Sequence, residues 1–311
     1  MRKGPIVTLA VLLAACTPGV AATTTSRPPA GTSSPETPTP TTMTSSLTTA
    51  TPTSTTPPVT TTAPTTTSSA PPEVLSPFAR PAWLGTRILP LGPDGENGIP
   101  QPTPPELLDR RLETPDVLQP PPGEDFASSI GPVPDDVLAR STWTEDCPLA
   151  LDELAYVTVT HFGFDGEYHT GELIVNAGFA ERIVGVFEQL HAARFPIEEM
   201  RVITQEDLDA APTGDGNETT GFSCRPAVGS GSWSMHSYGL AIDINPFHNP
   251  YLKGELVLPE LATAYVDRER VLPGMMMDGD VAVEAFAAIG WEWGGDWNTL
   301  KDWMHFSENG R

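Results

Sequence analysis

Two short segments hold residues whose types and spacing can do chemistry. The first contains His236 and Asp243, and the second contains Asp302 and His305. Two histidines and one aspartate are a plausible ligand set for catalytic zinc, because three protein ligands leave the fourth tetrahedral position to water. Zn²⁺ lowers the pKa of such a water to about 7 and so produces a nucleophile at neutral pH. These residues therefore indicate a hydrolase.

The chain between His236 and Asp243 must bend if both side chains are to face one site. Asp243 lies seven positions after His236, and in a continuous strand an odd offset puts two side chains on opposite faces. We expect Gly239 to supply this bend. Ile242 and Ile244 flank Asp243 in an alternating run, which predicts a strand that packs the isoleucines on one face and presents Asp243 on the other.

The second half of the sequence has the pattern of a globular domain. We expect strands over residues 156–162 and 200–204. A helix capped by Asn176 is predicted by the apolar stripe of Phe179, Ile183, Val186, Phe187 and Leu190. A further helix is expected over residues 280–289, closed by Gly290. Strands and helices mixed without regular alternation indicate an α+β fold with a mostly antiparallel sheet flanked by helices.

The first half of the sequence differs from this domain in composition. The chain has 311 residues and 35 Pro, and residues 17–76 are mostly Thr, Ser, Pro and Ala. Such a segment cannot bury enough apolar area to offset chain entropy, so we expect a disordered tether. Residues 77–140 remain rich in Pro, and their apolar residues lack a period, which leaves their fold open. One folded domain is therefore expected, over residues 141–311.

Residues 1–16 have the pattern of a signal peptide. A basic start precedes an apolar run that is too short to span a bilayer as a helix. The run ends in Leu13-Ala14-Ala15-Cys16, which resembles a bacterial lipobox. The resemblance implies that Cys16 is lipidated and anchors an extracytoplasmic protein to the bacterial cell membrane. The alternative is an ordinary secretory signal with an incidental cysteine, and both imply export.

Export bears on the two remaining cysteines, Cys147 and Cys224. An oxidising compartment lets disulfides persist, so we expect a bridge between them. The bridge would stiffen the segment that carries Arg225. Two reduced, buried thiols are the alternative.

The residues around the two reactive segments resemble a known peptidase family. The string SxHxxGxAxD begins at Ser234, and a DxxH string begins at Asp302; together they are more specific than a lone histidine pair. The similarity covers about residues 156–306 and includes residues 170–176, 221–226, 245–251 and 293–297. These strings are similar to the D-alanyl-D-alanine carboxypeptidase and L-alanyl-D-glutamate endopeptidase family, most of all its endolysin-type branch. The resemblance implies the zinc fold that this family shares with the hedgehog signalling domain.

The resemblance also implies a role for each site residue. The zinc ligands would be His236, Asp243 and His305. Asp302 would deprotonate the zinc water and then protonate the leaving amine. Some relatives have Glu at this position. The alternative role for Asp302 is a partner outside the ligand set that orients His305. Arg225 matches an arginine thought to stabilise the developing oxyanion, with a structural salt bridge as the alternative. Ser234 and Tyr238 are weaker candidates for substrate contacts.

The function implied by the resemblance is that of a monomeric, zinc-dependent peptidase acting on peptidoglycan stem peptides. The cleaved bond, D-Ala-D-Ala or L-Ala-D-Glu, is left open. A non-catalytic cell-wall peptide-binding lipoprotein on the same fold is an alternative, and so is an enzyme acting on non-wall peptides or dipeptides. The charge balance, 40 Asp and Glu against 17 Lys and Arg, argues against a nucleic-acid partner.

Overall fold

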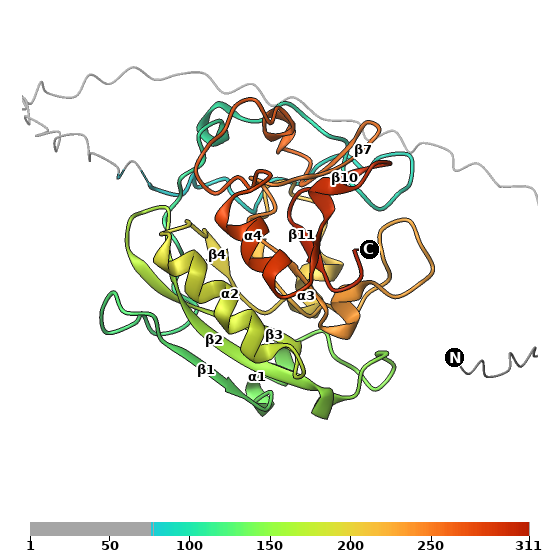
Figure 1. Ribbon diagram of the computed structural model, residues 1–311. Helices are drawn as coiled ribbons and strands as arrows, with labels where there is room; N and C mark the ends of the chain where they lie inside the picture. The colour runs from blue at the N-terminus through green and yellow to red at the C-terminus, as the bar shows by residue number, and fades with distance from the viewer. Residues whose placement is uncertain (1–75, 77, 311) are drawn as a thin grey trace, which may run out of the picture. The chain divides into compact units, whose positions relative to one another are not determined.

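The computed structural model describes residue 76 and residues 78–310, which are coloured in Figure 1. The predicted signal peptide with Cys16, and the predicted tether up to residue 75, lie outside the described residues. No helix within residues 78–310 is long and apolar enough to cross a membrane.

The largest sheet is an antiparallel meander in the order β1-β2-β3. Its strands are β1 (Ser128–Gly131), β2 (Leu154–Phe162) and β3 (Tyr168–Asn176). One face of β2 and β3 packs on α2 (Ala180–Ala192), which lies over the sheet in Figure 1. The strand predicted over residues 156–162 is thus confirmed.

The helix α2 carries the predicted apolar stripe but begins later than expected. Ile183, Val186, Phe187 and Leu190 are all buried against the sheet. Its N-cap position is Phe179, so the prediction that Asn176 caps the helix was wrong. Asn176 is the last residue of β3, and its side-chain oxygen accepts a hydrogen bond from the N–H of Gly178, which forms the turn into the helix.

The extent of the strand predicted over residues 200–204 was also wrong. It is the two-residue strand β4 (Glu199–Met200), paired in parallel with β5 (Glu218–Thr219). The chain leaves the strand because Thr204 caps the next helix, α3 (Gln205–Asp209). Its hydroxyl accepts a hydrogen bond from the N–H of Asp207, while the Asp207 carboxylate accepts from Thr204, a capping box.

Two small antiparallel sheets carry the second half of the chain. In one, β11 (His305–Ser307) lies between β6 (Ala241–Asp243) and β9 (Glu292–Trp293). In the other, β7 (Tyr251–Lys253) lies between β8 (Leu256–Leu258) and β10 (Lys301–Asp302). The α+β class and the mostly antiparallel pairing are confirmed.

The predicted helix over residues 280–289 is confirmed as α4 (Val281–Ala288). The Asp280 carboxylate accepts hydrogen bonds from the N–H groups of Ala282 and Val283 and caps its first turn. Phe286 of α4 stacks on Phe306 of β11, with ring centroids 4.1 Å apart. This contact ties the helix to the strand that carries His305. The remaining helices are α1 (Asp135–Arg140), η1 (Pro105–Leu107), η2 (Leu151–Glu153), η3 (Met235–Tyr238), η4 (Thr263–Val266) and η5 (Gly294–Asp296).

Residues 78–116, which we call the strap, pack on the domain although their sequence shows no period. Leu89, Leu107 and Leu112 are buried in a cluster with Phe247, Leu261 and Tyr265. Arg110 of the strap is fully buried and donates from Nε and Nη2 to the two carboxylate oxygens of Glu198, both at 2.7 Å. In such a pair each buried charge is compensated by the other, since water cannot reach either group. Residues 128–140 then form β1 and α1, so the folded unit includes much of the Pro-rich region.

Candidate metal site and cleft

One large cleft, about 1400 Å³ in volume, brings most of the sequence-predicted site residues together. The residues that line it include His236, Asp243, His305, Asp302, Arg225 and Ser234. Tyr238 is half-buried and does not line this cleft. The strap, the loop before β5 and the hairpin over residues 225–234 form the other walls.

His236 is positioned by a single turn of 3-10 helix, η3. The hydroxyl of Ser234 accepts a hydrogen bond from the N–H of His236 at 3.3 Å and caps this turn. Gly239 ends it with φ +62° and turns the chain into β6, so the predicted bend is confirmed. A Cβ atom on Gly239 would lie 2.4 Å from the backbone N of Asn176, and therefore only glycine fits.

Asp243 and His305 face each other across two paired strands. They occupy matching positions in the antiparallel pair β6 and β11. Ile242 and Ile244 are fully buried in the core, whereas Asp243 lines the cleft. The predicted alternation of packed isoleucines and a site-facing aspartate is confirmed.

The three side chains converge at short distances. Nε2 of His236 lies 3.1 Å from Oδ2 of Asp243, and Nδ1 of His305 lies 2.9 Å from Oδ1 of the same carboxylate. The two imidazole nitrogens are 3.3 Å apart. One candidate ligand atom from each residue lies within 4.8 Å of the others, and all three residues are buried.

The donor set fits a divalent metal ion. Nδ1 of His236 lies 2.6 Å from the carbonyl oxygen of Gly221. A carbonyl oxygen can only accept, so Nδ1 carries the proton and Nε2 offers a lone pair to the cluster. Ligating histidines generally have such a partner on their second nitrogen. Two imidazole nitrogens and one carboxylate match the ligand types that catalytic zinc prefers, with a position left for water.

The electrostatics of the cluster keep the Asp243 carboxylate ionised. Burial disfavours its charge, but His236 and His305 hold the pKa of this carboxyl well below its usual range. A carboxylate that stays charged at all physiological pH values is suited to a cation.

Asp302 is the unusual carboxyl group of the cleft. Its Oδ1 atom is buried and has no hydrogen-bond partner among the residues that the structure describes. Burial, opposed in part by His305, raises the pKa of Asp302 to about 7, and the charge of Asp243 adds to the rise. An orphaned carboxylate oxygen next to a potential metal site is poised to bind a proton or a polar ligand.

Arg225 lies at the start of the hairpin that lines the cleft. Ser237 holds its backbone: the Ser237 hydroxyl accepts from the N–H of Arg225 at 3.0 Å and lies 2.8 Å from its carbonyl oxygen. Within residues 78–310, the Arg225 guanidinium forms no ion pair, and its charge acts on Asp302. The preceding residue, Cys224, forms a disulfide with Cys147.

The sequence reasoning missed several residues that position or line the site. Gly221 orients His236, and Ser237 holds the Arg225 segment. Trp233 lines the cleft with its side chain 41% exposed, and Val228 accompanies it on the same hairpin. Gly221 lies within a segment that resembles the peptidase family, but no local pattern reveals that its carbonyl contacts a histidine fifteen residues away.

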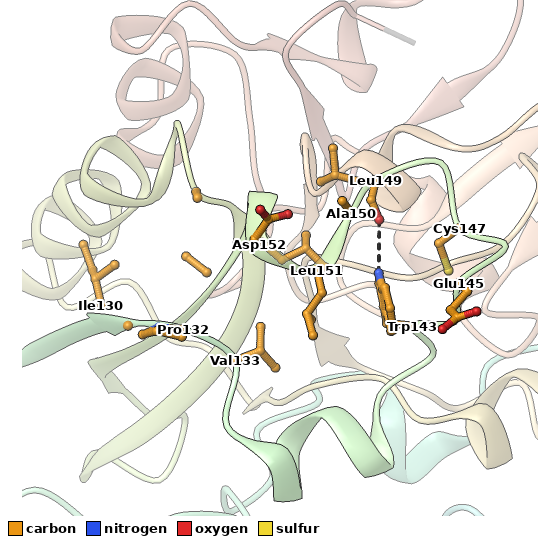
Figure 2. Close-up of a pocket in the computed structure, with 14 residues that line it drawn as sticks. Ile130, Pro132, Val133, Trp143, Glu145, Cys147, Leu149, Ala150, Leu151 and Asp152 are labelled. Carbon is orange, nitrogen blue, oxygen red and sulfur yellow. Dashed lines mark hydrogen bonds between the residues drawn. The ribbon is translucent and has the colours of Figure 1, made fainter.

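A separate apolar pocket of about 950 Å³ lies beside the disulfide (Figure 2). Trp143, Leu151 and Val133 surround it, and Nε1 of Trp143 donates to the carbonyl oxygen of Leu149 at 3.1 Å. The pocket shares no lining residue with the cleft and contains no histidine. The candidate metal ligands therefore line the cleft and not this apolar pocket.

Comparison with known proteins supports the resemblance. Residues 228–308 match the model of a family described as D-alanyl-D-alanine carboxypeptidase. The matched segment contains all three candidate metal ligands and Asp302. Neither the curated proteins nor the solved structures give a match to the chain.

Proposed function

We propose that this protein is a zinc-dependent peptidase, because the site lies in the segment that matches the D-alanyl-D-alanine carboxypeptidase family. Its substrate would be the stem peptide of bacterial peptidoglycan, in which it hydrolyses one amide bond. The observation that carries the proposal is the convergence of His236, Asp243 and His305 within 4.8 Å. These three residues would hold the metal.

A bound Zn²⁺ would supply Lewis acidity and lower the pKa of its water to about 7. Asp302 takes the proton from the attacking water as the new carbon–oxygen bond forms. The same carboxyl returns the proton to the nitrogen as the carbon–nitrogen bond breaks, so that a neutral amine leaves. A carboxyl group serves best as both base and acid when its pKa lies near the working pH, and burial moves the pKa of Asp302 upward in that direction.

Arg225 stabilises the negative charge that develops on the carbonyl oxygen. Its guanidinium can donate hydrogen bonds in a fork and has no carboxylate partner among the described residues. Ser237 fixes the backbone that carries it. Ser234 lines the cleft beside His236 and can contact the substrate, whereas Tyr238 lies away from the cleft lining.

The test is mass spectrometry of a defined pentapeptide muropeptide after incubation with the purified, zinc-loaded protein. Loss of the terminal alanine would identify a carboxypeptidase, and release of the peptide after its first alanine would identify an endopeptidase. The His236→Ala variant is the control. Absence of cleavage despite bound zinc would contradict the peptidase proposal and favour a cell-wall peptide-binding protein.

We also propose that the protein is a lipoprotein of the bacterial cell envelope, anchored through Cys16. The lipobox-like sequence supports this, as does a disulfide that suits an oxidising compartment. Labelling with a radioactive fatty acid should mark the protein and fail to mark a Cys16→Ala variant. An unlabelled mature protein would contradict the anchor.

A further inference from the structure

The cleft is larger than the chemistry of one amide bond requires. Its volume of about 1400 Å³ exceeds the roughly 300–1,000 Å³ of pockets that enclose drug-sized ligands. A dipeptide is smaller than such ligands. The space beyond the reacting groups is therefore available to further residues of a peptide.

The strap supplies part of the wall around this additional space. Arg80, Ala82, Leu84 and Glu96 line the cleft together with His236 and His305. The strap lies outside residues 228–308, so the family match assigns it no role. One continuous cleft thus joins the candidate metal site to a segment of unassigned function.

The contacts of the strap make it a fixed wall. Leu89 is buried, and its N–H donates to the carbonyl oxygen of Pro212, in the loop before β5, at 2.9 Å. The N–H of Gly85 donates to the Asp215 carboxylate at 2.9 Å. Together with the buried Arg110 and Glu198 pair, these bonds hold the cleft-lining residues in one arrangement.

We propose that the strap forms a distal substrate subsite, which binds the part of an extended peptide that lies away from the scissile bond. The inference rests on the proposed peptidase function and specifies its substrate: peptides longer than a dipeptide are preferred. Side chains of the strap contact the peptide and contribute to its affinity, while bond cleavage occurs at the other end of the cleft.

Ala82 offers a direct test because it is exposed and lines the cleft. An Ala82→Trp substitution places bulk in the distal space. The matched control is Ile88→Trp, since Ile88 is 72% exposed on the same segment and does not line the cleft. Both variants should unfold at the temperature of the wild type.

The first readout is kcat/KM for a series of peptides that share the cleaved bond and increase in length beyond a dipeptide. In the wild type and in Ile88→Trp, kcat/KM should rise with length. In Ala82→Trp the advantage of long over short peptides should fall by about tenfold, mainly through KM. Independence of length in the wild type, or an unchanged advantage in Ala82→Trp, would overturn the proposal.

The second readout needs no turnover. In an Asp302→Asn background, calorimetry should show that Ala82→Trp weakens binding of a pentapeptide muropeptide by about tenfold, and that Ile88→Trp does not. If the wild type cleaves no peptide, the peptidase proposal fails. If the wild type cleaves peptides but Ala82→Trp changes neither the length dependence of kcat/KM nor the peptide affinity, only the proposal of a distal subsite fails.

Discussion

The main chains of Thr220 and Asp243 are joined by a pair of hydrogen bonds. The N–H of Thr220 donates to the carbonyl oxygen of Asp243 at 3.0 Å, and the N–H of Asp243 donates to that of Thr220 at 2.9 Å. Asp243 is thus paired with Thr220 on one side and with His305 on the other. Gly221, next to Thr220, orients His236. The backbone therefore places the three candidate ligands before any metal binds.

Removing one ligand should abolish metal binding. His236→Ala deletes a nitrogen donor from a three-residue set, and we expect both bound zinc and peptidase activity to be lost. Zinc content measured by mass spectrometry checks this. His191→Ala, which changes a histidine on α2 whose ring contacts the carbonyl oxygen of Glu124, should retain the metal. Full zinc content in His236→Ala would exclude this residue as a ligand.

Neutralising Asp302 should separate metal binding from turnover. Asp302→Asn keeps the size of the side chain but cannot accept the proton of the attacking water, so kcat should fall by about 10²–10⁴-fold while zinc stays bound. Asp296→Asn is the control, since Asp296 is exposed and does not line the cleft. Full activity of Asp302→Asn would show that this residue is not the general base.

Gly239→Ala should destabilise the fold more than a comparable glycine substitution. Both Gly239 and Gly254 have positive φ, +62° and +61°, so alanine costs about 1–2 kcal/mol at either position. Only Gly239 has backbone atoms in the space of the new Cβ, whereas Gly254 has none within 4 Å. Chemical denaturation should give a clearly larger loss for Gly239→Ala. Equal losses would mean that the chain near Asn176 can move aside.

Arg110→Met should remove a large part of the stability, about 3–5 kcal/mol, because it leaves the Glu198 charge buried with less compensation. Arg111→Met is the control: Arg111 pairs with Asp109 at the surface, and its loss should cost less than about 1 kcal/mol. Urea denaturation of both variants measures the difference. Equal costs would show that the strap is not anchored through Arg110.

The buried ion pair of Arg110 and Glu198 predicts how stability depends on pH. Burial opposes the charge of Glu198, but Arg110 holds the pKa of this carboxyl below its usual value. The unfolded chain therefore takes up the proton at higher pH than the folded chain. The contribution is fully present above the unfolded pKa of about 4.3 and is lost as pH falls through the folded pKa. Chemical denaturation at pH values from roughly 3 to 6, which bracket the unfolded pKa, measures the free energy of unfolding. This free energy should fall as the pH is lowered in the wild type and should fall less in Arg110→Met.

Opening the disulfide should loosen the Arg225 segment. The bridge joins residues 77 positions apart, and closing a loop of that length stabilises by about 4 kcal/mol in the chain-entropy model. A Cys147→Ser, Cys224→Ser double variant should lose stability of this order and part of its kcat, since Cys224 precedes Arg225. Two reactive thiols in the native, unreduced protein would contradict the bridge.

The features that were predictable from sequence depend on local patterns. The alternation around Asp243, the bend at Gly239 and the stripe of α2 each involve residues a few positions apart. The motif strings also sufficed to group His236 with His305, although these are 69 positions apart. Family resemblance supplied that long-range information, which periodicity does not contain.

The features that were missed depend on partners far along the chain or on competition between neighbours. The strap shows no period, and it is held in place by long-range contacts such as that between Arg110 and Glu198, 88 positions away. The short strand β4 ends at Met200, and Thr204, which was predicted to belong to it, caps the helix α3 instead. Neither outcome can be read from a window of consecutive residues, since each depends on which bond forms elsewhere.

The order of residues along the chain bears on when the candidate ligand set can assemble during synthesis. Arg110 emerges before Glu198, and His236 and Asp243 emerge before His305 on β11, the last of the described strands. Contacts between such distant residues form late in folding. A nascent chain that lacks β11 therefore cannot assemble the candidate ligand set of His236, Asp243 and His305.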